Sequence, residues 1–177
     1  MRIIAGDRRG ARIAAPKGTA TRPTGDRVRE AAYNLIGPVE DASVLDLFAG
    51  SGAMGLEALS RGARRCVFVE SDRVACAVIR DNLEKLRLTG AVVQQRDAFQ
   101  ALREERAAGR SYDLVLVDPP YGAWPELQDR LAEALPPLVS PDGLLVVETS
   151  AKVEPELPLD LVTSRRYGSA RITLFTR

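Results

Sequence analysis

The chain has 177 residues, of which 45% are hydrophobic and 28% are charged, and its formal net charge is +1. This length suits one compact domain with a small extension, and the hydrophobic fraction is large enough to bury a substantial core. The chain contains no histidine, which excludes a Ser-His-Asp triad, a Cys-His pair and any histidine-based metal site, and we expect no metal.

The first 30 residues are unusually basic. They carry eight basic and three acidic side chains, a net charge of +5 against −4 for the remainder. Short apolar runs at residues 2–4 and 11–14 flank a turn-rich segment, which predicts a β-hairpin with Arg8 and Arg9 at its tip. A basic arm on a mildly acidic body predicts an anionic partner, and an ordinary solvated surface is the alternative.

Proline and glycine then interrupt the chain up to residue 25. A helix is expected over residues 27–36, with Asp26 as its N-terminal cap. Its inner side should carry four apolar residues, Val28, Ala31, Ala32 and Leu35. We therefore divide the chain into a basic N-terminal hairpin extension, residues 1–25, and a main domain, residues 26–177.

From residue 43 onward, predicted strands and helices alternate. The strands are residues 44–47, 66–70, 91–95, 113–117 and 144–148, and the helices are residues 53–60, 73–87, 99–107 and 125–135. Nearly continuous apolar strands are typical of a parallel sheet covered by helices on both faces. Two further strand-like runs, residues 161–167 and 170–176, are joined by Gly168-Ser169 and predict a terminal antiparallel hairpin. The predicted fold class is therefore α/β, a Rossmann-like and mostly parallel sheet.

The first strand of this series ends at an acid and a glycine-rich turn. Gly50-x-Gly52-x-x-Gly55 matches the dinucleotide fingerprint, and Glu70 ends the second strand about 20 residues later, which alone favours NAD. Asp46 changes that interpretation, because its carboxylate would repel a pyrophosphate and attract the cationic amine and sulfonium of S-adenosylmethionine. A methyl-donor site is therefore preferred, and Glu70 would bind ribose hydroxyls of either cofactor.

Asp97 follows the third strand and precedes the next helix. Its carboxylate can accept a hydrogen bond from an adenine amino group, with the Ala98 backbone or Phe99 alongside. Capping of the following helix is nearly as reasonable, and the two roles can hold together.

The tetrapeptide Asp118-Pro119-Pro120-Tyr121 follows the fourth strand, so it should share the sheet edge of Asp46. The two prolines remove N–H donors and leave outward-facing carbonyl acceptors. Asp118 and the Pro119 carbonyl can each accept one N–H of a planar exocyclic amine, and Tyr121 offers a ring on which a base can stack. A plain turn is the alternative interpretation.

These two motifs together resemble the S-adenosylmethionine-dependent methyltransferases that modify exocyclic amines. Arg2-Ile3-Ile4-Ala5-Gly6 and the Arg-Pro-Thr-Gly-Asp-Arg-Val-Arg-Glu segment at residues 22–30 are similar to the RsmD family, which methylates a guanine N2 in small-subunit (16S) ribosomal RNA. The resemblance covers essentially the whole chain. It implies a seven-stranded sheet with a reversed final hairpin, and S-adenosylmethionine as cofactor.

The resemblance also implies roles for individual residues. The methionine end of the cofactor would be held by Asp46, Phe48, Gly50 and Gly52, the ribose by Glu70, and the adenine by Asp97 and Ala98. The target guanine would be held by Asp118, Pro119 and Tyr121. The RNA, within an assembling or assembled ribosomal subunit, would be contacted by the basic arm residues Arg8, Arg9, Arg12, Lys17 and Arg22.

Several other functions remain open from the sequence. An adenine-N6 methyltransferase acting on DNA or RNA shares the Asp-Pro-Pro-Tyr motif, and a small-molecule methyltransferase, an NAD enzyme or a non-catalytic RNA-binding assembly factor are further alternatives. No run approaches the roughly 20 apolar residues of a membrane span, and we see no signal peptide. Cys66 and Cys76 are expected to be reduced and buried, which favours a cytoplasmic protein without a membrane partner.

Overall fold

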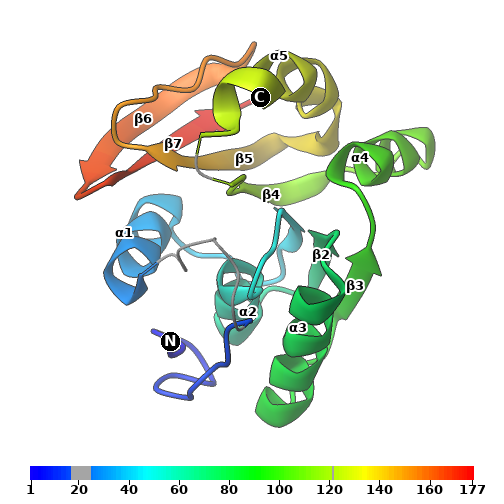
Figure 1. Cartoon of the computed structure of the whole chain (residues 1–177), viewed down its shortest axis with the longest axis vertical. Helices are drawn as coiled ribbons and strands as arrows, with labels where there is room; N and C mark the ends of the chain where they lie inside the picture. The colour runs from blue at the N-terminus through cyan, green and yellow to red at the C-terminus, as the bar shows by residue number, and fades with distance from the viewer. Residues whose placement is uncertain (17–24, 121) are drawn as a thin grey trace.

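A seven-stranded sheet in the order β3-β2-β1-β4-β5-β7-β6 forms the centre of the computed structural model, which describes residues 1–16, 25–120 and 122–177 (Figure 1). The strands are β1 (Ser43–Leu47), β2 (Arg65–Glu70), β3 (Ala91–Gln95), β4 (Tyr112–Val117), β5 (Val139–Ser150), β6 (Asp160–Tyr167) and β7 (Ala170–Thr176). Strands β1 to β5 pair in parallel, whereas β7 pairs antiparallel with both β5 and β6. The Rossmann-like sheet with a terminal antiparallel hairpin is therefore confirmed.

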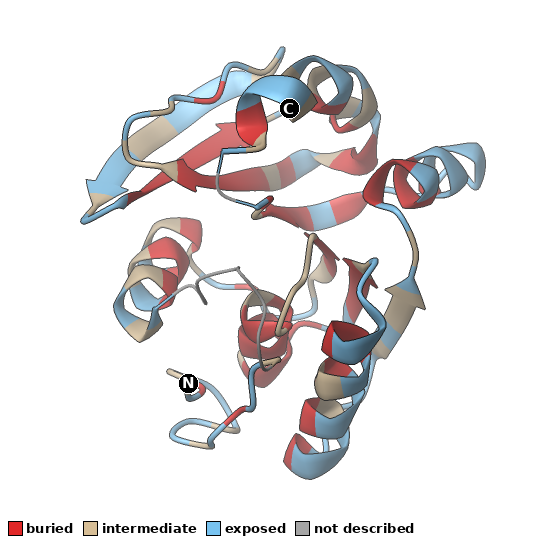
Figure 2. Cartoon of the chain, in the orientation of Figure 1, coloured by how far each residue is buried: buried red, intermediate tan, exposed pale blue. Residues whose placement is uncertain are grey.

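Helices cover both faces of this sheet. They are α1 (Asp26–Ile36), α2 (Ala53–Ser60), α3 (Arg73–Leu86), α4 (Ala98–Ala107), α5 (Trp124–Ala134) and the 3₁₀ turn η1 (Pro136–Leu138). Successive strand residues point to opposite faces, so Val44 packs in the core beneath α1, α2 and α3, whereas Leu45 packs beneath α4 and α5. Figure 2 shows the central strands buried and the edge strands β3 and β6 largely not.

The predicted elements agree closely with the observed ones, and β5 is the main exception. It begins at Val139 rather than at residue 144, because Val139 already pairs with Tyr112 before a register shift. Cys66 and Cys76 are both free thiols and buried, as expected. None of the helices in the described parts of the chain is long and apolar enough to cross a membrane.

The N-terminal segment folds back on itself but does not form the expected strand ladder. A single antiparallel bridge joins Arg2 and Arg12. Ile3 and Ile13 are buried in the same core as α1, α2 and α3, so the segment packs against the main domain. The backbone N–H groups of Ile4 and Ala5 donate to the Glu57 carboxylate at 2.8 and 2.9 Å, which attaches the segment to α2. The division of the chain at residue 25 stays a prediction.

The inner face of α1 differs from the predicted one. Val28, Ala31 and Leu35 are only partly buried, while Ala32 and Tyr33 are fully buried. The helix starts with Asp26 itself, after an N-cap at Gly25 that has no side-chain hydrogen bond. The predicted cap role of Asp26 was therefore wrong.

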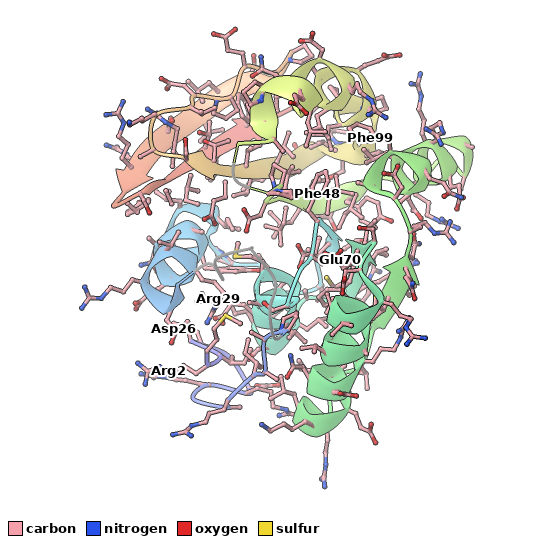
Figure 3. All side chains as sticks on the ribbon, viewed as in Figure 1. Arg2, Asp26, Arg29, Phe48, Glu70 and Phe99 are labelled. Atoms are coloured by element: carbon pink, nitrogen blue, oxygen red, sulfur yellow. The ribbon has the colours of Figure 1, made fainter. Side chains whose placement is uncertain are left out.

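Arg29 explains why the buried face of α1 is rotated. Its side chain has no exposed area, and its Nε lies 3.6 Å from a carboxylate oxygen of the equally buried Glu57. Asp26 accepts a hydrogen bond from Arg29 Nη2 at 3.0 Å and lies 3.4 Å from Arg2 Nε. Figure 3 shows Arg2, Asp26 and Arg29 together beside α1. Hydrophobic periodicity alone does not anticipate a buried arginine on this face.

Candidate active site

The carboxyl ends of β1, β4 and β5 lie side by side at one edge of the sheet. Leu47 pairs with Val117, and Val117 pairs with Val147. The strand ends therefore place Asp46, Asp118 and Glu148 on the same edge, where open α/β sheets bind ligands. The shared edge expected for the first two residues is confirmed. Tyr121, Lys17 and Arg22 lie outside the described residues, so their predicted roles are untested.

The turn after β1 has a strained, glycine-dependent backbone. Phe48 (φ 61°), Gly50 (φ 53°) and Gly52 (φ 75°) all adopt left-handed conformations. Such a conformation costs a non-glycine residue like Phe48 on the order of 1–3 kcal/mol and is concentrated at ligand sites. Helix α2 begins directly after this turn, so its first N–H groups face the same edge.

The third glycine of the motif serves packing. A Cβ at Gly55 would lie 2.3 Å from a ring atom of Phe68 and 2.7 Å from Cys66 Sγ. Only glycine lets α2 lie this close to β2, which is the role of the third glycine in dinucleotide-type turns.

Asp46 is a buried carboxylate, with 3% of its surface exposed. Its Oδ2 accepts a hydrogen bond from the Gly55 N–H at 2.9 Å. Burial raises its pKa to about 8; the Gly55 hydrogen bond opposes this shift, and the carboxylates of Asp118 and Glu70 add to it. No lysine or arginine among the described residues forms an ion pair with it. Such a site suits a cationic guest and disfavours a pyrophosphate.

Glu70 ties the glycine turn to the end of β2. Its Oε2 accepts the Gly50 N–H and its Oε1 accepts the Asp72 N–H, both at 2.8 Å. The Ser71 hydroxyl also donates to Oε1, at 3.4 Å. A carboxylate has about four lone-pair positions, so these three bonds still leave acceptor capacity for a ribose hydroxyl. The ribose role stays a prediction.

Asp97 caps α4, as one of its two predicted roles required. Its Oδ1 accepts the N–H groups of Phe99 and Gln100, each at 3.0 Å. Its Oδ2 accepts no hydrogen bond from the described residues, which leaves the adenine role open. Figure 3 shows Phe48, Glu70 and Phe99 approaching from the β1 turn, β2 and α4. The Phe99 ring is itself covered by the guanidinium of Arg130, 3.6 Å from the ring centroid.

A mostly apolar pocket lies beside the Asp118-Pro119 segment. Trp124, Glu148, Thr149 and Val153 also line it. The pocket wall is fixed by hydrogen bonds, because Trp124 Nε1 donates to Gln128 Oε1 at 2.7 Å and Thr149 Oγ1 donates to the Val153 carbonyl at 2.7 Å.

Glu148 and Trp124 were missed from the sequence. The available signal for Glu148 was its position at the end of the fifth predicted strand, residues 144–148, which resembles that of Asp118 directly after the fourth.

One side chain of the basic arm, Arg8, forms hydrogen bonds within the protein. The Arg8 guanidinium donates to the Leu86 carbonyl at 2.5 Å and to the Arg87 carbonyl at 3.5 Å, at the end of α3. Arg9 and Arg12 are both exposed, and neither has an ion pair among the described residues. RNA contacts by Arg8, Arg9 and Arg12 stay predictions, and the structure favours the last two.

Comparison with known proteins assigns the chain to a family. The family model described as Conserved hypothetical protein 95 matches residues 1–176. YlbH of Bacillus subtilis (strain 168) is 38% identical over 188 residues, covering 100% of this chain and 99% of YlbH. Ribosomal RNA small subunit methyltransferase D of Escherichia coli (strain K12) is 38% identical over 164 residues, covering 92% of this chain and 78% of that protein. A solved structure of a hypothetical protein from Thermus thermophilus is 32% identical, covers 100% of this chain and 99% of that chain, and has a TM-score of 0.86.

Proposed function

Since this chain belongs to the Conserved hypothetical protein 95 family, the RsmD family, we propose that it transfers a methyl group from S-adenosylmethionine to the exocyclic N2 of a guanine in small-subunit ribosomal RNA. One observation carries the proposal. The buried carboxylate Asp46, which has no basic partner in the described chain, shares a sheet edge with the acceptor pair of Asp118 and Pro119. The cationic methyl donor is thereby held next to the amine that receives the methyl group.

The cofactor side of the site consists of the turn after β1 and the ends of β2 and β3. When bound, S-adenosylmethionine supplies a methyl group on a positively charged sulfur. Asp46, with Phe48, Gly50 and Gly52 around it, holds the charged methionine end. Glu70 binds the ribose hydroxyls, and Asp97 with the Ala98 backbone binds the adenine. Each role uses acceptor capacity or space that the described contacts leave available.

The target side orients the guanine amine. Asp118 and the Pro119 carbonyl each accept a hydrogen bond from one of the two N2–H groups, which turns the nitrogen lone pair toward the methyl group. Positioning of this kind can supply up to about 7–11 kcal/mol of the barrier reduction. Positive charge develops on the nitrogen, and the Asp118 carboxylate stabilises it. The proton then leaves to Asp118 or to water, so the reaction needs no histidine.

The RNA is held around this edge. A base must leave its stack to enter the pocket, which costs a few kcal/mol and is cheapest in a loop. Tyr121 offers a stacking surface worth about 1–3 kcal/mol per base. The arm residues Arg9 and Arg12, with Arg8, Lys17 and Arg22, bind flanking phosphates in an assembling or assembled ribosomal subunit in the cytoplasm.

A comparison of methyl acceptors tests this function. The protein is incubated with methyl-labelled S-adenosylmethionine and either small-subunit ribosomal RNA, small ribosomal subunits or duplex DNA. Label in the RNA or the subunits, and none in DNA, is the expected result. Label in DNA would favour the adenine-N6 alternative, and absence of label together with absence of cofactor binding by calorimetry would favour a non-catalytic assembly factor.

A further inference from the structure

Two carboxylates stand next to each other in the pocket proposed for the target base. Val117 of β4 pairs with Val147 of β5. Asp118 directly follows Val117 in the chain, and Glu148 directly follows Val147. Neighbouring strands lie about 4.8 Å apart, so the two acids start from adjacent positions. Both line the same pocket.

Glu148 is not an ordinary surface acid. Only 7% of its surface is exposed. Glu148 has contacts of its own within the fold, and it also lines the pocket beside Asp118. The adjacent Thr149 also helps to fix the pocket wall, because its hydroxyl donates to the Val153 carbonyl. The pocket therefore presents two carboxylates, Asp118 and Glu148, to whatever enters it.

The Watson–Crick edges of the bases differ next to the exocyclic amine. In guanine the reactive N2 amine lies between N1–H and N3, so its neighbour on the Watson–Crick edge is a donor. In adenine and cytosine the exocyclic amine is flanked by a ring nitrogen with a lone pair. An ionised carboxylate can only accept hydrogen bonds. A carboxylate beside the amine site therefore binds guanine and repels the ring nitrogen of the other two bases.

We infer that Glu148 is a specificity-determining residue, which accepts the N1–H of the target guanine while Asp118 and the Pro119 carbonyl hold its amine. This inference rests on the proposed function, because it concerns the base that enters the same pocket. It explains how an Asp-Pro-Pro-Tyr motif that also suits adenine becomes restricted to guanine. A site built to pair with a polar group rejects analogues that lack that group.

2-Aminopurine provides the test. This base keeps the amine at C2 but has a lone pair at N1 in place of the N–H. The target guanine is first located by mass spectrometry of the methylated RNA. It is then replaced by 2-aminopurine through ligation of a synthetic segment, in the RNA or reconstituted subunit that the wild type methylates. We expect the wild type to prefer guanine by about 10- to 100-fold in kcat/KM.

Glu148→Gln is the matching protein variant. Its amide can accept from N1–H or donate to the N1 lone pair, so the preference should fall to a few-fold. The control Glu156→Gln changes an exposed acid outside the pocket lining and should keep the wild-type ratio. Because each protein is compared with itself on two substrates, loss of folded protein lowers both rates and leaves the ratio unchanged.

The outcomes separate the inference from the function on which it rests. If the wild type methylates 2-aminopurine with the same kcat/KM as guanine, the inference is overturned whatever the variant does. Full guanine preference in Glu148→Gln overturns it as well. A wild type that forms no N2-methylguanosine at all contradicts the proposed function instead.

Discussion

The substitution Asp46→Asn distinguishes two effects of this carboxylate, the stability that its burial costs the fold and the affinity that its charge gives to cofactor binding. Asp46→Asn keeps an oxygen that can accept the Gly55 N–H, now at 2.9 Å, but it cannot ionise. In the cofactor-free protein burial raises the pKa of Asp46 from 3.8 to about 8. The folded chain therefore retains a proton that the unfolded chain releases above about pH 4.

The size of the effect follows from that shift. One pKa unit corresponds to about 1.4 kcal/mol. A shift of the Asp46 pKa from 3.8 to about 8 therefore lowers the unfolding free energy of the wild type by at most about 6 kcal/mol between pH 4 and pH 8. The stability is fully present below pH 4 and is lost progressively as the pH rises to about 8. Relaxation and water entry reduce such penalties to a few kcal/mol. We expect Asp46→Asn to be about 2–3 kcal/mol more stable than the wild type at pH 8.5 and equal to it near pH 4.

Cofactor binding should change in the opposite direction. S-adenosylmethionine carries a charge on sulfur that S-adenosylhomocysteine lacks, so Asp46→Asn should lose more affinity for the first than for the second. In the wild type, affinity for S-adenosylmethionine should rise as the pH approaches 8, because binding requires the ionised acid. The variant should lose that pH dependence.

Urea unfolding between pH 4 and 8.5 and calorimetric titration at pH 6, 7 and 8 measure both effects. If Asp46→Asn gains no stability between pH 4 and 8.5, burial of this carboxylate does not cost the fold the free energy given above. If the variant binds S-adenosylmethionine as tightly as the wild type, Asp46 does not hold the charged end of the cofactor.

Three further predictions concern other parts of the site. Asp118→Asn should lower turnover by about 100-fold or more, as loss of a transition-state contact does, with the Kd for the cofactor changed less than twofold; a large rise in that Kd would move Asp118 out of the target pocket. Reversing the arm charges, Arg9→Glu with Arg12→Glu, should weaken RNA binding and reduce its salt slope by about 1 per lost phosphate contact, whereas unchanged binding would end the role of the arm. Gly55→Ala should destabilise the protein by about 1–3 kcal/mol in urea unfolding through the clash with Phe68; wild-type stability would show that α2 can shift freely.

The sheet could be predicted because its strands and helices have clear apolar patterns and turn residues. The strand ends then follow from topology, which is how Asp46 and Asp118 were brought to one edge before their contacts were known. The hairpin at Gly168-Ser169 was equally clear, since two β-rich runs are separated by two turn residues.

The failures have a common physical cause, which is that burial depends on tertiary neighbours. Arg29 was counted as part of a basic arm, yet it is buried against Glu57. Removing residues 1–15 to test the arm would also remove Ile3 and Ile13 from the core, so charge reversal is the cleaner perturbation. Glu148 was placed at a strand end but given no role, because its proximity to Asp118 depends on the pairing of β4 with β5.

The most direct test of the central claim is nucleoside mass spectrometry of small-subunit ribosomal RNA after incubation with the protein and S-adenosylmethionine. The RNA or subunits are taken from a strain that lacks the native enzyme. We predict N2-methylguanosine with the wild type and none with Asp118→Ala, whose cofactor affinity stays intact. N6-methyladenosine in its place, or equal product from both proteins, would contradict a guanine amine held at the edge that Asp46 and Asp118 share.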